Sequence, residues 1–338
     1  MKWSRVWLSV VVVILLAVAV LASPTFPNLT AQSTLVPRAY LPIIERRSSW
    51  RPFSDTSPWN VPIGPNPEID PNSATMIATL EGSAVQGGFW INMNYWTVPV
   101  YYADANTPKY DVPCDNPSHR CLPPFGPDVP IPDGAIPDPM SDGSLCIVDL
   151  SRQLSWDMSQ ARRLNGGWVT TWGYVFDISG SGVQTDGIGS ARASGFPLIA
   201  GLIRLDEIKQ GRIDHALVIA YDSPRAGVYV YPASVGYDFR GGPNAIPAGG
   251  RIQLDPNLNL DTLGLSPGAK VIARALQKYG AYVSVLGGSL VVFAEGLYGK
   301  PDQSWSGVLD EDDLTGLSWQ HFRVIKLPPL KYMPGYGD

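Results

Sequence analysis

The sequence predicts a mainly β protein, an antiparallel β-sandwich or jelly roll that carries two or three short helices. Two observations support this expectation. Glycine and proline are abundant, with 34 and 32 of the 338 residues, and such a composition favours many strands joined by tight turns. Short apolar segments also recur along the chain without the regular strand–helix alternation of a parallel α/β protein.

Composition and charge narrow the classes of function. Hydrophobic residues make up 45% and charged residues 16% of the chain, as in a folded globular protein. The formal net charge is -5 and the isoelectric point is near 5.2. Nucleic acids and anionic membrane surfaces attract basic proteins, so neither is expected as the main partner.

The N-terminus has the pattern of an export signal. Lys2 and Arg5 precede an apolar run, Val6 to Ala22, that ends in small residues. We expect this segment to be cleaved and the protein to be secreted. The alternative is that the segment is retained as an N-terminal membrane anchor, because the run approaches the length that spans a membrane. The expected organisation is a signal peptide at 1–22, a disordered linker at 23–47, a single β-rich domain at 48–328 and a flexible tail at 329–338.

Three segments have the residue pattern of short helices. The best defined covers 267–279, with Ser266 as its N-cap and proline at its first position. A second covers 197–210, where apolar residues recur at helical spacing before Gly211. A third is expected to follow a capping sequence and to end near residue 80.

The strands are predicted from apolar runs bounded by turn residues. We expect hairpins at 144–158 and at 281–295, the latter turning at Gly287-Gly288. The expected strands are 91–102, 144–149, 153–158, 167–178, 216–220, 227–231, 281–286, 290–295 and 322–327.

The cysteines are interpreted in the light of secretion. Cys114 and Cys121 lie in a loop rich in proline and asparagine, and we expect them to form a small disulfide ring. Cys146 lies in an apolar strand and is expected to be a buried free thiol. A zinc site that includes His119 is a poor alternative, because no second ligand pair follows at the usual spacing.

The densest set of chemically capable side chains lies between Arg204 and His215. An imidazole titrates near neutral pH and suits general acid–base catalysis, while Glu207 could act as an acid or base and Arg204 as an anion clamp. Alternatively, His215 is a buried structural residue and the charges cover a solvated helix face. The expected catalytic residues are His215, Glu207, Arg204 and Asp149, and the expected substrate contacts are Trp156, Trp172 and Arg212.

Other candidate sites have weaker support. Asp177 opens a segment, 177–182, whose oxygen side chains alternate as in a calcium loop, and Asp186 follows, but the closing glutamate is missing. A glycine-rich turn is the alternative, and no other cofactor is expected. Tryptophans are abundant, and one or two are expected to stack on sugar in a cleft. The tryptophans considered are Trp59, Trp90, Trp96, Trp156, Trp168, Trp172, Trp305 and Trp319.

Several motifs together resemble an uncharacterised family of secreted bacterial proteins. The resemblance covers roughly residues 48 to 325 and implies a shared fold, but the family has no known activity to carry over. The motifs are Ser49-Trp50, Trp59-Asn-Val-Pro-Ile63, Ser141-Asp-Gly143 leading to Asp149, the segment 194–204, Asp206-Glu-Ile208, the segment 211–217, the segment 275–280, and Trp305 with Asp312-Asp313-Leu314.

The leading functional hypothesis is a secreted carbohydrate-active protein, a hydrolase or lyase acting on extracellular polysaccharide or cell-surface glycan. The export signal, the aromatic-rich β composition and the Arg204–His215 segment favour it. One alternative is a non-catalytic carbohydrate- or surface-binding protein, for which the tryptophans suffice. Another is a secreted peptidase-like hydrolase with a carboxylate–histidine site.

Overall fold

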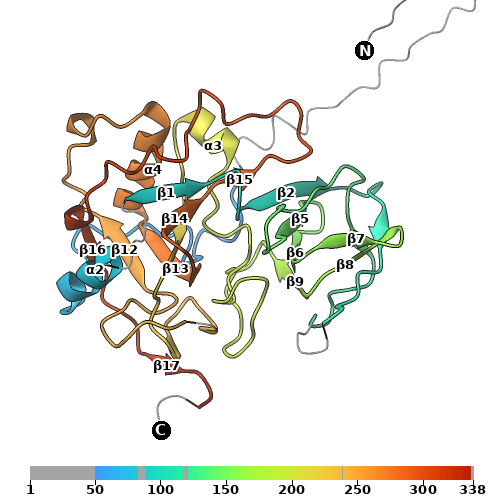
Figure 1. Cartoon of the computed structure of the whole chain (residues 1–338), viewed down its shortest axis with the longest axis horizontal. Coiled ribbons are helices and arrows are strands. Elements are labelled where there is room, and N and C mark those ends of the chain that lie inside the picture. Colours follow the sequence, from blue (N-terminus) through green and yellow to red (C-terminus); the bar gives the residue numbers. More distant parts are fainter. Residues whose placement is uncertain (1–49, 83–87, 117–120, 238, 336–338) are drawn as a thin grey trace, which may run out of the picture. The chain divides into compact units, whose positions relative to one another are not determined.

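The computed structural model describes residues 50–82, 88–116, 121–237 and 239–335, and these belong to one compact unit (Figure 1). The expected signal peptide and linker, residues 1–47, lie outside the described residues. Within the described part of the chain, no helix is long and apolar enough to cross a membrane.

The predicted mainly β class with short helices is confirmed, and most strands belong to two sheets. The six-stranded sheet contains, in spatial order, β1 (Phe89–Asn92), β14 (Leu290–Phe293), β10 (Leu217–Tyr221), β13 (Ala281–Leu286), β12 (Arg251–Leu254) and β16 (Phe322–Val324). The five-stranded sheet contains β15 (Glu295–Gly296), β2 (Val98–Ala103), β5 (Leu145–Asp149), β6 (Leu154–Ser159) and β9 (Trp172–Asp177).

Short two-stranded ribbons complete the β structure. They are β3 (Lys109–Tyr110) with β4 (Val129–Pro130), β7 (Arg162–Leu164) with β8 (Gly167–Val169), and β11 (Val228–Tyr229) with β17 (Lys331–Tyr332). Strand β17 of this last pair lies within the segment expected as a flexible tail, 329–338. It pairs with β11 of the folded unit, and the side chain of Met333 is buried beside it.

Both sheets contain parallel as well as antiparallel pairs. The hairpin expected at 144–158 forms, as β5 and β6. The hairpin expected at 281–295 does not form, although both of its strands exist, because β10 lies between β13 and β14. Strand β10 pairs with β13 in parallel, and the intervening chain includes the long connection with a helix that a parallel pair requires.

The α-helices of the described residues are α2 (Ser73–Gly82), α3 (Leu205–Gln210) and α4 (Pro267–Lys278), and two single 3-10 turns are η1 (Leu260–Thr262) and η2 (Trp319–His321). Helix α4 forms as predicted, since the Ser266 hydroxyl accepts the Ala269 N–H at 3.1 Å. Helix α3 is shorter than the predicted 197–210. Gly201 has φ +65°, and a Cβ there would lie 2.5 Å from the Val218 nitrogen, so a turn packed against β10 replaces the first half of the predicted helix.

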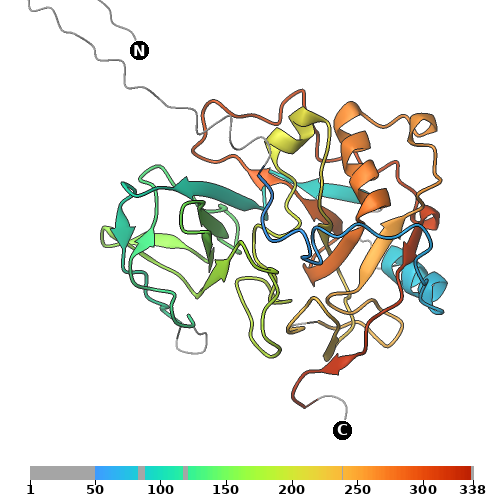
Figure 2. The ribbon, with the colours of Figure 1, turned by 180° about the vertical axis from the view of Figure 1, so that it is seen from behind.

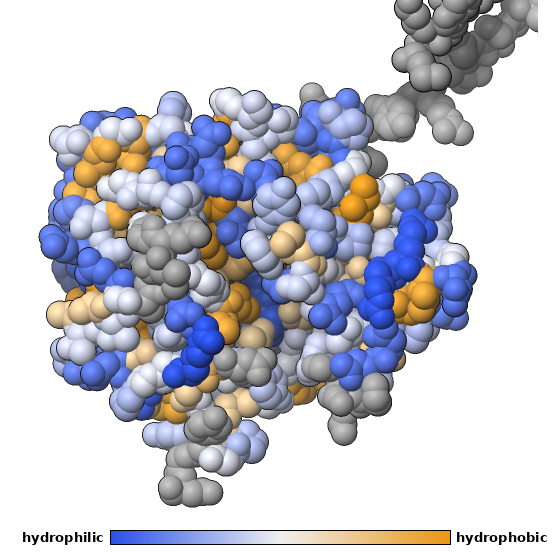
Figure 3. Space-filling model, viewed as in Figure 1, coloured by the Kyte–Doolittle hydropathy of each residue, from blue (hydrophilic) through white to orange (hydrophobic). Residues whose placement is uncertain are grey.

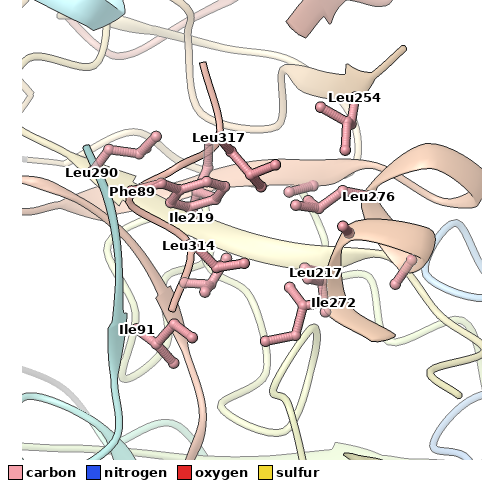
Figure 4. Close-up of a cluster of buried hydrophobic side chains, with 14 of the residues drawn as sticks. Phe89, Ile91, Leu217, Ile219, Leu254, Ile272, Leu276, Leu290, Leu314 and Leu317 are labelled. Atoms are coloured by element: carbon pink, nitrogen blue, oxygen red, sulfur yellow. The ribbon is translucent and has the colours of Figure 1, made fainter. Parts of the chain in front are cut away.

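Strand β10 is buried on both faces. Leu217 and Ile219 join a cluster with Ile272 and Leu276 of α4, and Figure 4 shows these side chains pointing toward one another beside β1. The alternate residues of β10 belong to a second cluster. This two-sided burial explains why the sequence of β10 is a continuous apolar run. Seen from behind, α4 lies against the six-stranded sheet (Figure 2).

The five-stranded sheet is also covered on both faces. Val100 and Val148 belong to the same cluster as one face of β10, so a shared apolar core joins the two sheets as in a β-sandwich. Ile147 and Met158 belong to a third cluster on the opposite face. The predicted disulfide between Cys114 and Cys121 is confirmed, and Cys146 is a buried free thiol.

Candidate functional site

Three of the predicted catalytic residues lie together. Arg204 Nη2 donates to Glu207 Oε1 at 2.7 Å, and His215 Nε2 lies 3.1 Å from the same oxygen. The Arg204 backbone N–H also donates to Glu207 Oε2 at 3.1 Å, which fixes the first turn of α3 in the manner of a capping box. Arg204 reaches across to the Trp50 carbonyl at 3.0 Å.

This Arg204–Glu207–His215 cluster is sealed from solvent. The exposed fractions are 2% for His215, 3% for Arg204 and 7% for Glu207. The second ring nitrogen of His215, Nδ1, lies 2.9 Å from the Ala216 carbonyl oxygen, so both nitrogens are occupied by neighbouring protein atoms. The neighbouring Arg204 cation holds the pKa of Glu207 below its usual range despite burial. The three side chains therefore contact one another in a closed interior, and the Arg204–Glu207 contacts hold the first turn of α3.

Among the other predicted site residues, Arg212 lies beside this cluster, since its N–H donates to the Glu207 carbonyl at 3.1 Å. Asp149 closes the β5–β6 turn, where it accepts the N–H groups of Ser151 and Arg152. Arg152 covers the ring of the buried Trp156 at 4.7 Å. Arg212 is exposed and pairs with Asp214, and Trp172 is half-buried on β9. The contacts of Asp149 and Trp156 are those of a turn and a core.

The calcium candidates do not share a contact. Asp177 accepts the N–H and hydroxyl groups of Ser179, two residues along, and Asp186 pairs with Lys331. Among the described residues, no group of three or more His, Cys, Asp or Glu side chains is placed to hold a metal ion.

An open groove lies where the chain crosses from one sheet to the other. Two segments make this crossing, because β1 leads into β2 and β14 leads into β15. The two segments are hydrogen-bonded to each other, since the Ala294 N–H donates to the Asn92 carbonyl at 2.8 Å. Cavities of about 750, 540 and 270 Å³ adjoin there. Figure 3 shows a hollow with apolar residues in its floor near the middle of this face.

The three cavities share walls. Trp90 and Glu311 line both the 750 and the 540 Å³ cavities. The 540 and 270 Å³ cavities share Trp96, Asp142, Val285, Leu286 and Phe293. We call this set of adjoining cavities the junction groove. An extended hollow of this kind suits a chain-like ligand better than a compact one.

Exposed aromatic rings stand at the centre of the junction groove. In the turn between β1 and β2, the exposed fractions are 56% for Tyr95 and 47% for Trp96. Trp96 has φ +49°, a conformation that is uncommon for a bulky residue and that tertiary contacts must hold in place.

Hydrogen bonds on both sides of the turn hold its backbone in place. Asn92 Nδ2 donates to the Trp96 carbonyl at 3.1 Å, and Asn94 Nδ2 donates to Glu311 Oε1 at 2.8 Å. The Thr97 N–H donates to the buried Asp138 at 3.3 Å. Since the backbone is held while the rings stay accessible, ligand binding would require little ordering of the turn.

Asp142 is brought to the junction groove by the loop before β5. Its carbonyl accepts the Gln160 N–H at 2.7 Å. The next residue, Gly143, has φ +47°, and a Cβ there would lie 2.7 Å from Gln160 Cα, so only glycine allows this approach. This close approach explains why a glycine follows the aspartate in the Ser141-Asp-Gly143 motif. It places Asp142 on the wall between two cavities.

Asp142 and Glu311 are the carboxylates of the 540 Å³ cavity. The Asp142 side chain is exposed to the groove, but the surrounding protein removes part of its hydration, and this desolvation raises the pKa of its carboxyl group. A carboxylic acid that is both accessible and easier to protonate can donate a proton to a bound ligand. Glu311 is exposed and accepts a hydrogen bond from Asn94.

The residue pattern favours Trp156 and Trp172 as substrate contacts. Trp96 is one of the eight tryptophans considered for sugar stacking, and Asp142 and Glu311 are not among the predicted site residues. A local signal does mark Trp96. It follows another aromatic residue within the asparagine-rich segment 92–96, and aromatic side chains in a turn have no apolar surface beside them to pack against. Asp142 belongs to the Ser141-Asp-Gly143 motif, but the motif does not indicate a ligand site, and Glu311 has no comparable signal. They become neighbours of one cavity only through the fold.

Comparison of the chain with protein-family models, with curated proteins and with solved structures found no match in any of the three. The interpretation of the junction groove therefore depends on its own geometry.

Proposed function

We propose that this protein binds a segment of polysaccharide in the junction groove. The single observation that carries the proposal is the pair of exposed rings, Tyr95 and Trp96, held in a fixed turn beside an extended hollow. Sugar rings present apolar C–H faces that stack on aromatic rings, and their hydroxyl groups bond to carboxylates and amides. Asp142, Glu311 and Asn94 supply such groups along the same walls.

Glycoside hydrolysis in the same groove is the second candidate function, and the pair of carboxylates favours it. Asp142 would protonate the glycosidic oxygen, and Glu311 would act as the carboxylate that activates water or stabilises the developing positive charge. The raised pKa of Asp142 suits the acid role, because its carboxyl group stays protonated to a higher pH than an ordinary aspartate.

The proposed setting is extracellular. The apolar run from Val6 to Ala22 has the composition of an export signal. The Cys114–Cys121 disulfide is typical of an oxidising compartment. Both observations favour a polysaccharide outside the cell as the ligand.

The binding test compares the tryptophan that the structure selects with one that the sequence selected. The secreted protein and its Trp96→Ala and Trp172→Ala variants are titrated with a panel of soluble polysaccharides by isothermal calorimetry. We expect Trp96→Ala to weaken binding by about 10-fold to 100-fold, because one stacked ring is lost from the centre of the groove. Trp172→Ala is expected to bind as the native protein does. Equal loss in both variants, or none in either, contradicts the proposal.

The hydrolysis test uses the polysaccharide that binds best. Asp142→Asn and Glu311→Gln are each expected to lower the rate of chain cleavage by about 10²-fold or more while leaving affinity nearly unchanged. Asp128→Asn is the matched control, since Asp128 is exposed and absent from the groove walls. Mass spectrometry of the products distinguishes addition of water from elimination. If the native protein binds the polysaccharide but does not cleave it, the hydrolysis proposal fails and polysaccharide binding remains as the proposed function.

A further inference from the structure

We propose that Asp138 is a positioning residue for Trp96, so that polysaccharide binding in the junction groove depends on a carboxylate behind the groove wall. The inference rests on the proposed function and identifies the side chain that sets the place of the stacking ring. Asp138 is buried, with an exposed fraction of 3%. The described walls of the three adjoining cavities do not include it.

The peptide group that follows Trp96 is held at both of its polar atoms. Asn92 Nδ2 donates to the Trp96 carbonyl at 3.1 Å, and the Thr97 N–H donates to Asp138 Oδ1 at 3.3 Å. Thr97 is itself buried, and its hydroxyl donates to the Ala294 carbonyl. Because the orientation of this peptide plane sets ψ of Trp96, these contacts decide where the backbone directs the exposed ring.

Trp96 needs such support because its own backbone conformation is unfavourable. Its φ is +49°, a value that is costly for a residue with a bulky side chain and that persists only where tertiary contacts impose it. Asn92 acts from within the same turn, whereas Asp138 lies 41 residues along the chain from Thr97. Asp138 therefore supplies a long-range contact to a conformation that the turn alone does not favour.

Asp138 is itself fixed by the loop that carries Asp142. Its Oδ2 accepts the Met140 N–H at 3.2 Å, and its own N–H donates to the Ser144 carbonyl at 3.0 Å. These two contacts close the loop, and β5 begins directly after it at Leu145. The carboxylate is therefore anchored at the start of a strand in the five-stranded sheet, and a rigid element of this kind can hold a functional side chain in place.

Tyr298 connects Asp138 to a second point of the same turn. Its hydroxyl lies 3.3 Å from Asp138 Oδ1 and also contacts the Asn94 carbonyl oxygen. The hydroxyl has one proton, which it can donate to either oxygen. Asp138 thus reaches the turn directly at Thr97 and through Tyr298 at Asn94, on both sides of the exposed rings.

Asp70 is the matched control for Asp138. It is also a buried aspartate whose carboxylate accepts N–H groups from two segments, from Asn72 at 2.9 Å and from Leu327 at 3.3 Å. The described walls of the three cavities do not include it. Asp70→Asn therefore removes comparable contacts at a place that the proposal gives no role in binding.

The first test needs no ligand. The secreted protein is labelled with fluorotryptophan, and the fluorine NMR resonance of Trp96 is identified by its absence from a Trp96→Phe variant. We expect Asp138→Asn to shift this resonance, because an amide cannot accept both the Thr97 and the Met140 N–H groups. Asp70→Asn should leave it in place.

A second variant covers the case in which Asp138→Asn does not fold. Asp138→Ser has a smaller side chain, which leaves room for a water molecule to accept the buried N–H groups. We expect it to shift the Trp96 resonance as well, since the water does not tie the turn to the loop before β5. A resonance that stays in place in the folded Asp138 variants overturns the inference.

The second test is a double-mutant cycle by isothermal calorimetry on the polysaccharide that binds best. We expect Asp138→Asn to weaken binding by about 3- to 10-fold, since one hydrogen bond that holds the turn is lost. The double variant Asp138→Asn/Trp96→Ala should bind within about 2-fold of Trp96→Ala alone, because Asp138 acts through the Trp96 ring. Asp70→Asn should bind as the native protein does. Fully additive losses in the cycle, or an equal loss in Asp70→Asn, contradict the inference.

The outcomes separate this inference from the proposed function. If Trp96→Ala weakens binding but Asp138→Asn neither shifts the Trp96 resonance nor lowers the affinity, the groove binds polysaccharide and the positioning role fails. If the resonance shifts while the affinity stays the same, Asp138 stabilises the turn only and the inference is overturned. If no polymer binds the native protein, the proposed function fails, and the role of Asp138 in binding fails with it.

Discussion

The Arg204–Glu207–His215 cluster and the junction groove both contain carboxylates beside aromatic rings, but they differ in access. In the cluster, the Glu207 carboxylate has close partners on Arg204 and His215, and all three side chains are buried. In the groove, Asp142 and Glu311 are accessible and share a cavity with the exposed Trp96. The cluster is closed to solvent, whereas the groove leaves room for a ligand.

This difference shows why a dense set of charged residues in a sequence is a poor guide to a binding site. Charges that are close along the chain can neutralise one another locally, as Arg204 and Glu207 do across the first turn of α3. A ligand site instead requires polar groups that a ligand can reach. Asp142 and Glu311 are both exposed and line one cavity, and they lie far apart in the sequence.

The largest expected effect tests whether the buried cluster is structural. Glu207→Gln keeps the shape of the side chain but removes the charge opposite Arg204, and we expect it to lower the free energy of unfolding by about 3–5 kcal/mol. Because the pKa of Glu207 is lowered in the folded protein, its contribution is present above its unfolded pKa and is lost as pH falls through the folded pKa. The difference from the native protein should therefore shrink in acid.

Urea unfolding across this pH range measures the effect. Glu81→Gln is the control, because Glu81 is exposed on α2. If Glu207→Gln unfolds like the native protein but loses polysaccharide cleavage, the Arg204–Glu207–His215 cluster is catalytic and not structural.

A smaller effect with the opposite pH dependence is expected at Asp157. Burial raises its pKa to about 6 in the folded protein, so its contribution is fully present below the unfolded pKa and is lost as pH rises through about 6. Asp157→Asn retains an oxygen that can accept the Leu198 N–H. Relative to this variant, native stability should fall by about 2–3 kcal/mol between roughly pH 4 and pH 8.

The measurement is thermal or urea unfolding of both proteins at several pH values, with Asp128→Asn as the exposed control. A difference that stays constant across this range would show that Asp157 is ionised with an ordinary pKa in the folded protein.

The smallest effect is expected for His215→Ala. The substitution removes hydrogen bonds to Glu207 and Ala216 but leaves the Arg204–Glu207 pair, so we expect a loss of about 1–2 kcal/mol in unfolding free energy. Affinity for polysaccharide should not change in the folded fraction, since the groove walls contain none of these residues. Loss of binding or cleavage at unchanged stability would restore His215 as a functional residue.

Features set by a few neighbouring residues could be predicted from the sequence. Ser266 and Pro267 mark the start of α4 and Gly280 follows its end, because capping and left-handed glycine are local effects. The β5–β6 hairpin and the Cys114–Cys121 disulfide were likewise predicted from short spacings. The mainly β class followed from composition.

Only the tertiary structure decided which side chains meet and which remain accessible. The insertion of β10 between β13 and β14 replaced a predicted hairpin with a mixed sheet, since strand order depends on long-range packing. The junction groove joins side chains from the β1–β2 turn, the loop before β5, the segment before β10 and the chain after β15. No local pattern links these segments, because burial and neighbourhood are properties of the folded chain as a whole.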